Sequence, residues 1–400
     1  MWTANNPNGK RDVVEGTGRL HHLDALKLFL IVLVVVLHAA QPYGPADWWY
    51  VEREGGSALL AEIARVGGTF LMSLFLFVSA FFVPAAHDRQ GGARFLGHRF
   101  RRFLPLVLIG FFVVVPALMY PYHQNFRDHP SLDPLTYYLD VYLGEGETPQ
   151  GWTGPSWPDR QFAHLWFLQH LLVYVSLYAA WRWVAGRFGR PRAPKAVPSA
   201  PPGTIAICGF VVVVSVSTFL LRVPYPVDTW IPLLEFIQTE PADLALQASF
   251  FWVGLLAYRH GWLTSFGERA GLAWLAVGGV LAAAHLSFGS RIEVLYAPGG
   301  LTTGSLLWST VETVMCVSLS IGLLTAFRRW ANRPSPRVAE AGALVFTVYL
   351  IHVPVVVALQ YATLDLAPWP AFVIVAVVGT VASLLLARLL SRTPVLRRVL

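Results

Sequence analysis

Two titratable side chains in the first apolar segment carry the clearest chemical signal of the chain. Residues 24–42 form a run long enough to cross a bilayer, with Lys27 near its start and His38 near its end. The two positions are eleven apart, which is about three helical turns and about 16 Å, so both side chains lie on nearly one helix face. An imidazole can take a proton from a hydroxyl group and return it to a leaving group, and a lysine ammonium binds phosphate as a point charge. The structural alternative is a hydrogen-bonded histidine and a lysine that extends to the lipid headgroups.

Other polar side chains lie inside later apolar segments. His352 and Tyr349 are three positions apart on one helix face, and His164 opens the fourth apolar segment. Glu312 lies inside the eighth segment, where an ionised carboxyl costs about 2.5–3.5 kcal/mol, so we expect it to have a partner or to stay protonated. These groups fall at the depth of His38 and suggest one polar cavity. Taken singly, each is equally compatible with a structural hydrogen bond.

A dense arginine cluster precedes the third apolar segment, in what we expect to be a hairpin between two spans. Arg99, Arg101 and Arg102 belong to it. Such a cluster sets topology and contacts lipid headgroups, and it also suits a phosphate-bearing donor. No spacing of cysteines and histidines fits a metal site, and no nucleophile elbow or phosphate loop is present, so we expect neither a bound metal nor a covalent serine or cysteine nucleophile.

The composition predicts that many helices cross a membrane. Of the 400 residues, 55% are hydrophobic and only 13% are charged, against about 25% charged in a soluble domain, and the mean hydropathy is +0.52. We therefore predict an all-α polytopic membrane protein with about ten transmembrane helices. The segments are 24–42, 62–84, 103–120, 162–183, 204–221, 242–259, 269–288, 305–327, 341–361 and 369–390.

The distribution of lysine and arginine predicts the orientation. With the N-terminus in the cytoplasm, 24 of the 30 basic residues fall on the cytoplasmic side, and both termini are cytoplasmic. The net charge of +7 is then a topology signal and not a sign of nucleic-acid binding. Residues 1–18 read as a disordered cytoplasmic tail, residues 19–400 as one membrane domain, and residues 186–203 as a flexible cytoplasmic linker. The largest outer loop, 121–161, is acidic and aromatic, which suits either a saccharide or a belt that packs on itself.

Several of these residues give the chain a resemblance to a known family. It resembles the integral-membrane acyltransferases of family 3, in particular the branch of glucan biosynthesis protein C, a succinyltransferase. The signature of that family is an arginine, ten residues and a histidine, and here Lys27 and His38 occupy that spacing. Further similarities are Leu23-Asp24-Ala25-Leu26, Phe75 to Ser79, Arg101-Arg102-Phe-Leu-Pro105, His164-Leu-Trp166-Phe-Leu168, Gly254 to Arg259, and Tyr349-Leu-Ile-His352.

The resemblance implies transfer of an acetyl, succinyl or similar acyl group from acyl-coenzyme A, a co-substrate, to a hydroxyl of a carbohydrate or other envelope acceptor. It implies that His38 is the catalytic base and that Lys27, Arg99, Arg101 and Arg102 bind the donor. Supporting or acceptor-binding roles fall to Asp24, His164, Trp166, Glu312, Tyr349 and His352. The expected setting is a bacterial inner membrane. Lys27 keeps the positive charge of the family's arginine but lacks the planar guanidinium group that binds a phosphate through two hydrogen bonds.

A transporter or flippase of an envelope precursor is the alternative, since ten helices and buried polar groups suit it equally well. The sequence lacks the inverted repeat that many carriers have. Membrane lipids, acyl-coenzyme A and an envelope acceptor are the expected partners. The identity of the acyl group, that of the acceptor and the oligomeric state are left open by the sequence.

Overall fold

All ten apolar segments lie in helices. The computed structural model describes residues 20–44, 49–53, 55–127, 129–152, 157–188, 199–233 and 237–393. The long helices are α1 His21–Ala40, α2 Ala58–Phe81, α4 Gly92–Ile109, α5 Val115–Phe126, α7 Trp166–Arg187, α8 Thr204–Arg222, α9 Pro241–His260, α11 Glu268–Glu293, α12 Thr303–Trp330, α13 Pro336–Ala362 and α14 Pro368–Leu390. Short elements are α3 Val83–Gln90, α6 Pro134–Thr136, α10 Trp262–Ser265, the 3-10 turns Gln41–Tyr43 and Ala163–Leu165, and the π turns Gly110–Val114 and Tyr137–Leu143. Strands β1 Ile231–Leu233 and β2 Ile237–Thr239 form one antiparallel hairpin. All other elements of the described residues are helical, so the all-α prediction is confirmed.

Eight helical stretches within the described residues are long and apolar enough to cross a membrane. They are His21–Tyr43, Ala58–Gln90, Gly92–Phe126, Thr204–Arg222, Glu268–Glu293, Thr303–Trp330, Pro336–Ala362 and Pro368–Leu390. The other two predicted segments form α7 and α9, which are long enough but are not among these eight apolar stretches. A multi-pass membrane protein is therefore confirmed, whereas ten crossings and two cytoplasmic termini stay predictions. The predicted tail and most of the predicted linker lie outside the described residues, although α7 continues to Arg187, inside that linker.

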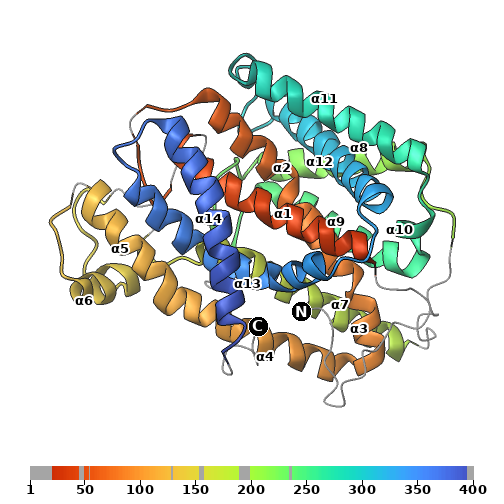
Figure 1. Cartoon of the computed structure of the whole chain (residues 1–400), viewed down its shortest axis with the longest axis horizontal. Helices are drawn as coiled ribbons and strands as arrows, with labels where there is room; N and C mark the ends of the chain where they lie inside the picture. Colours follow the sequence, from red (N-terminus) through yellow and green to blue (C-terminus); the bar gives the residue numbers. More distant parts are fainter. Residues whose placement is uncertain are drawn as a thin grey trace.

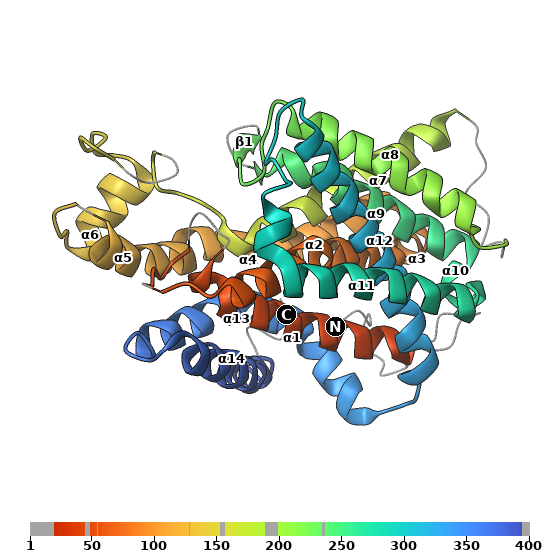
Figure 2. The ribbon, with the colours of Figure 1, turned by 90° about the horizontal axis from the view of Figure 1, so that it is seen from above.

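Helix α1 runs through the middle of the bundle. Figure 2 shows α13 and α14 on one side of α1 and the pair α11 and α12 on the other, and α2 also packs along α1. The buried residues of α1 recur every three or four positions, from Leu23 and Leu26 through Leu30 and Val34, with Ile31 and Val35 beside them. Because neighbours surround α1, its polar side chains meet protein from several elements.

The first and thirteenth helices lie side by side and run in the same direction. A Cβ built on Gly342 of α13 would lie 3.3 Å from the Cβ of Asp24, and ten residues later His352 contacts His38. The absence of a side chain at Gly342 thus lets α13 approach α1 closely at the Asp24 end. This pairing brings residues more than 300 positions apart in the sequence into one site.

The third apolar segment forms a longer helical stretch than the sequence indicates. Helix α4, a π turn at Gly110–Val114 and α5 follow one another from Gly92 to Phe126 (Figure 1). The expected basic hairpin is instead helical, and the chain turns just before it at Gly91, whose φ of 77° favours glycine. A Cβ on Gly110 would lie within 1.8 Å of the Leu165 side chain, so this glycine allows α4 to reach the residue after His164.

The segment after α5 forms its own small core beside the main bundle. Arg127 and Asp159 make a bidentate ion pair at 2.8 and 3.0 Å, and Tyr137 donates to the same carboxylate at 2.9 Å. Burial raises the pKa of Asp159, and the Arg127 guanidinium opposes that shift. Tyr122, Tyr137 and Tyr142 are buried in a cluster that reaches Val353 and Val357 of α13. Of the two interpretations of this region, the described residues fit the one in which it packs on itself.

Candidate active site

Three imidazoles from distant parts of the chain come together at one end of α1 and α13. His38 is on α1, His164 is in the 3-10 turn before α7, and His352 is fully buried on α13. The ring centroids of His38 and His352 are 4.9 Å apart, and those of His164 and His352 are 5.5 Å apart. We call these three residues the imidazole cluster. The sequence placed them at one depth, and the structure places them in contact.

The hydrogen bonds of the imidazole cluster assign its protons. Nδ1 of His352 lies 2.7 Å from the carbonyl oxygen of Tyr349, so it carries the proton and Nε2 is an acceptor. Nδ1 of His38 lies 2.8 Å from the carbonyl of Val34 and 3.3 Å from Nε2 of His352, so it donates to both. The basic nitrogen of His38 is then Nε2, which has no hydrogen-bond partner within the described part of the chain. A base oriented through its other nitrogen is the arrangement that proton transfer requires.

Two residues that the sequence did not single out hold this site at the C-terminal end of α1. The indole of Trp49 lies 5.3 Å from the His38 ring and donates to Oε1 of Gln360 at 2.8 Å. The amide nitrogen of Gln360 donates to the His38 carbonyl at 2.9 Å. Gln360 is a polar residue eight positions after His352 in an apolar segment. This spacing is the sequence feature that could have indicated a role for Gln360 at the site. Nothing local in the sequence marks Trp49.

Tyr349 connects His164 to the cavity described next. Its hydroxyl donates to the backbone carbonyl of His164, and Nε2 of His164 lies 3.3 Å from the carbonyl of Leu350. Tyr349 is buried, and its ring centroid is 5.8 Å from that of His164. The pair therefore fixes the start of α7 against the middle of α13.

A cavity of about 60 Å³ extends from Lys27 to Tyr349. Its lining residues come from α1, α2, α4, α7 and α13: Lys27, Ile31, Met72, Phe75, Val78, Ser79, Phe103, Phe167, Leu168, Leu171, Gly342, Ala343, Val345, Phe346 and Tyr349. On α13 the lining spans Gly342 to Tyr349, about 10 Å at 1.5 Å per residue. Lys27 lies at one end and the tyrosine that touches the imidazole cluster at the other. The predicted cation thus lines this cavity, whereas the predicted base His38 does not line it and is connected to it through Tyr349, His164 and His352.

Lys27 is buried and already has a carboxylate partner. Its side chain is paired with Asp24 at 2.8 Å and lies 5.9 Å from the ring centroid of Phe82. Among the predicted donor-binding arginines, Arg102 stacks on Phe346, a cavity wall, with its guanidinium 4.9 Å from the ring centroid. Arg99 is buried and lies 5.2 Å from Phe95, whereas Arg101 is exposed. Lys27 and Arg102 are therefore the predicted cations that the structure places at the cavity.

Two predicted supporting residues lie away from the imidazole cluster. The Glu312 carboxylate pairs with Arg222 and is not among the contacts of the three histidines in the described residues, so its expected place in one cavity with His38 is wrong. The expectation that this carboxyl has a partner is confirmed. Trp166, at the start of α7, packs against His170 at 5.1 Å and Trp230 at 6.0 Å, toward the β hairpin.

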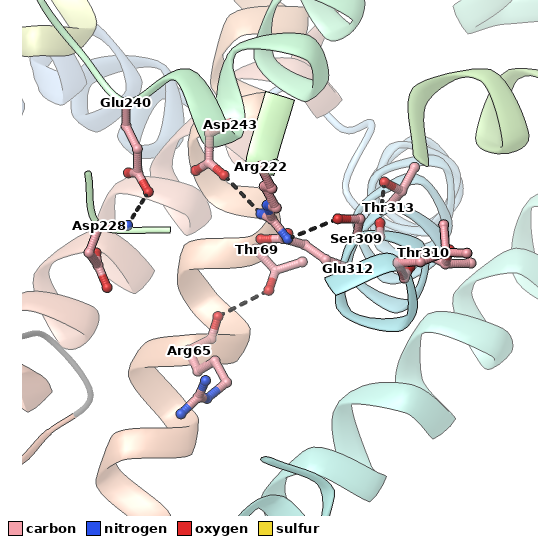
Figure 3. A network of polar contacts seen from close by, with 11 residues as sticks. Arg65, Thr69, Arg222, Asp228, Glu240, Asp243, Ser309, Thr310, Glu312 and Thr313 are labelled. Carbon is pink, nitrogen blue, oxygen red and sulfur yellow. Dashed lines mark hydrogen bonds and ion pairs between the residues drawn. The ribbon is translucent and has the colours of Figure 1, made fainter. Parts of the chain in front are cut away.

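Glu312 belongs to a separate group that we call the Arg222 cluster: Arg222, Asp243, Ser309 and Glu312. Arg222 is the last residue of α8 and is 1% exposed; it pairs with Asp243 at 3.2 Å and donates to Ser309 at 3.4 Å. Figure 3 shows the guanidinium between the two carboxylates, with Glu240 nearby. Burial, and after it the charge of Asp243, raise the pKa of Glu240 well above its usual value. Arg222 directly follows the predicted apolar segment 204–221.

The fold and the site define a multi-helix membrane protein with an imidazole cluster beside a cavity between its helices. The family model described as acyltransferase domain, of acyltransferase family 3, matches residues 20–388, nearly the whole chain. The chain therefore belongs to this family and is an acyltransferase. A comparison with curated proteins finds no match. The narrower resemblance to glucan biosynthesis protein C stays a prediction.

Proposed function

We propose that the protein is a membrane-bound O-acyltransferase that moves an acyl group from acyl-coenzyme A to a hydroxyl of a carbohydrate or other envelope acceptor. Family membership supports acyl transfer. The observation that carries the rest is the imidazole cluster, which contacts Tyr349 in the wall of a cavity that Lys27 also lines. We place the Lys27 end at the cytoplasmic face of a bacterial inner membrane, where coenzyme A thioesters are made.

In the proposed reaction His38 is the general base. Its Nε2 removes the proton of the acceptor hydroxyl, whose oxygen attacks the thioester carbonyl; the carbon–sulfur bond then breaks, and the coenzyme A thiolate takes the proton back from His38. His352 accepts from Nδ1 of His38 and so keeps Nε2 free for this work. His38 becomes positively charged during this step, and the hydrogen bonds of its Nδ1 to the Val34 carbonyl and to His352 stabilise that positive charge.

Donor binding is proposed for the cations at the other end. Lys27 lines the cavity and Arg102 stacks on its wall, so the diphosphate of the donor would lie outside that end while the thioester arm extends inward. Arg99 and Arg101, on the same helix as Arg102, would serve the more distant phosphate. Tyr349 and His164, at the inner end, would border the thioester.

The proposal is tested with His38→Ala. We expect the acyl groups on envelope glycans, measured by mass spectrometry of cells with the gene deleted and complemented, to be lost with this variant, while the protein is present at normal amounts in the membrane. General base catalysis contributes about 10²–10⁴-fold, which sets the expected loss. His98→Ala is the matched control, because this histidine is exposed on α4 and, within the described part of the chain, bonds only to Gln90. Normal acylation by the His38 variant would contradict the proposal.

A second measurement distinguishes the proposal from a transport function. The purified protein should release free thiol from an acyl-coenzyme A when membrane acceptor is present, and His38→Ala should not. A carrier that performs no chemistry would release none in either form.

A further inference from the structure

The Nε2 nitrogen of His38, which has no partner in the described part of the chain, can act on water as well as on an acceptor hydroxyl. With water in the place of the acceptor, the proposed reaction would yield a free acid and coenzyme A, and the donor would be wasted. Enzymes avoid such hydrolysis by excluding water from the site. A transferase with a base of this kind therefore requires a side chain that limits the access of water to the base.

Trp49 is placed to limit that access, because it lies against the ring of His38. The two ring centroids are 5.3 Å apart, and the ring planes are inclined by 36°. Both side chains are partly exposed, so the base can be reached from outside the bundle and the indole stands beside it. With the Lys27 end at the cytoplasmic face, as proposed above, His38 lies toward the opposite face, where water is plentiful.

A single buried amide fixes the indole in this position. The N–H of Trp49 can only donate a hydrogen bond, so it selects the oxygen of Gln360, at 2.8 Å. The amide nitrogen of Gln360 then faces the carbonyl oxygen of His38, to which it donates at 2.9 Å. Gln360 is 1% exposed, so both hydrogen bonds are shielded from solvent. This side chain thus ties Trp49 to the backbone of the base itself.

The segment 49–53, which carries Trp49, is held to its surroundings by further hydrogen bonds of side chains. The pairs are the Tyr361 hydroxyl with the Tyr50 carbonyl at 3.2 Å, the Tyr122 hydroxyl with the Glu52 carboxylate at 2.8 Å, and Arg53 with the Leu364 carbonyl at 2.7 Å. These partners belong to α13, to α5 and to the turn between α13 and α14. Trp49 is therefore positioned both by its own N–H and by the segment that follows it.

We propose, on the basis of the proposed function, that Trp49 limits the access of water to His38 and thereby makes the protein a transferase instead of a thioester hydrolase. In the reaction that it suppresses, Nε2 of His38 takes a proton from water, and the water oxygen attacks the thioester carbonyl. The carbon–sulfur bond then breaks, the thiolate takes the proton from His38, and a free carboxylic acid leaves with coenzyme A. Trp49 thus sets the specificity for an acceptor hydroxyl over water.

The substitution Trp49→Ala should admit water next to the base. The indole is several times larger than a water molecule, which takes about 30 Å³ in the liquid. Water occupies a vacated space when polar groups bind it, and two such groups are present. The oxygen of Gln360 loses its donor in this variant, and Nε2 of His38 accepts a hydrogen bond.

The test uses inside-out membrane vesicles from cells that express the full chain, which expose the donor face and retain the native acceptor. Acetyl- and succinyl-coenzyme A, each radiolabelled in the acyl group, are supplied separately. Label in free acid and label in membrane material are counted, with vesicles that lack the protein as background. We expect Trp49→Ala to raise the ratio of free acid to transferred label about tenfold or more, since access to a general base accelerates hydrolysis by up to about 10²–10⁴-fold.

Three further variants show whether the effect depends on the ring and on the base. Trp49→Phe retains an aromatic ring beside His38, so the ratio should rise less than in Trp49→Ala. His38→Ala combined with Trp49→Ala should return the production of free acid to background. The matched control is Trp369→Ala, which removes an indole that is 43% exposed in the first turn of α14 and packs on Phe372. This control should leave the ratio unchanged.

The outcomes separate this inference from the function on which it rests. An unchanged ratio in folded Trp49→Ala, or loss of transfer without a gain in free acid, would overturn the inference and leave an acyltransferase. Free acid that persists in the double variant, or the same rise in Trp369→Ala, would overturn it as well. If Trp49→Ala fails to fold, the smaller rise expected in Trp49→Phe decides the question in the same way. Wild-type protein that transfers neither acyl group would defeat the proposed function and this inference with it.

Discussion

The imidazole cluster and the Arg222 cluster are both buried polar groups in an apolar bundle, but their internal bonding differs. In the first, three neutral rings contact backbone carbonyls and one another, and the basic nitrogen of His38 has no partner among the described residues. In the second, a guanidinium is held through its two terminal nitrogens by two carboxylates and a serine, while its Nε has no partner among the described residues. Helix α2 lies between them, with Gly67 against Leu37 on one side and Arg65 near Trp308 on the other.

This difference indicates which cluster can do chemistry. A group that is to exchange protons must have a free site and modest bonding, whereas ions in a membrane interior are retained where they satisfy each other. We therefore expect substitutions in the imidazole cluster to affect turnover, and substitutions in the Arg222 cluster to affect folding.

The largest effect is expected for Arg222→Met. The change leaves Glu312, and the more exposed Asp243, without their cation, and removal of one partner from a buried ion pair costs about 3–5 kcal/mol. Thermal unfolding in detergent should show a strong loss of stability or little folded protein. Its control is Arg388→Met, which removes an exposed arginine that pairs with Glu340. A variant as stable as wild type would mean that the two carboxylates are not held by Arg222.

The double substitution Arg222→Met with Glu312→Leu sharpens the same point. Replacement of both buried ions by apolar side chains is often close to neutral for stability, since no charge remains unpaired. Asp243, whose side chain is 31% exposed, can be solvated. We expect the double variant to recover most of the stability lost in Arg222→Met and to keep acyl transfer. A stable but inactive double variant would assign this cluster a role in catalysis.

His352→Phe should produce the opposite pattern. Folding should persist, because the ring volume is retained, while kcat falls about tenfold to hundredfold, less than the 10²–10⁴-fold expected for the base itself. KM for the donor should change little, since His352 acts on His38 and not on coenzyme A. His352→Gln, which keeps a hydrogen-bond acceptor, should recover part of kcat. Equal losses in the phenylalanine and glutamine variants would contradict a role for this hydrogen bond.

The smallest effects are expected at the donor end of the site. Lys27→Met should raise KM for acyl-coenzyme A by about tenfold, as loss of one phosphate contact would, with a lesser change in kcat. Lys27→Arg restores the charge and adds the planar fork, so KM should return to the wild-type range. A lower kcat at unchanged KM in Lys27→Met would move this residue from donor binding to the chemical step.

The sequence predicted more of the fold than of the site. A long apolar segment in lipid must form a helix to satisfy its backbone hydrogen bonds, so the sequence located all ten helical segments to within a few residues. The main error was the basic hairpin predicted at 94–102. That error arose because a run of arginines between two apolar segments was interpreted as a loop. In the structure these arginines lie on α4, which begins at Gly92.

Contacts between helices were only partly predictable. The depth of His38, His164 and His352 follows from their place in each segment, but depth does not say which way a side chain faces. Glu312 lies at a similar depth and faces Arg222, across α2 from the histidines. Trp49 was missed because its contact with His38 joins two segments that have no common sequence pattern. Arg222 was missed because the predicted segment ends one residue before it, whereas α8 includes it.

The pairing of α1 with α13 has a consequence for the time at which the protein becomes active. The two imidazoles that share a proton are separated by 314 positions, so His38 is synthesised early and its partner near the end. Until the ribosome has delivered α13 and it has inserted, the nascent chain holds a histidine without the neighbour that selects its tautomer, and the space beside Lys27 has no second wall. Unfinished or truncated chains should therefore neither consume thioester nor compete for it.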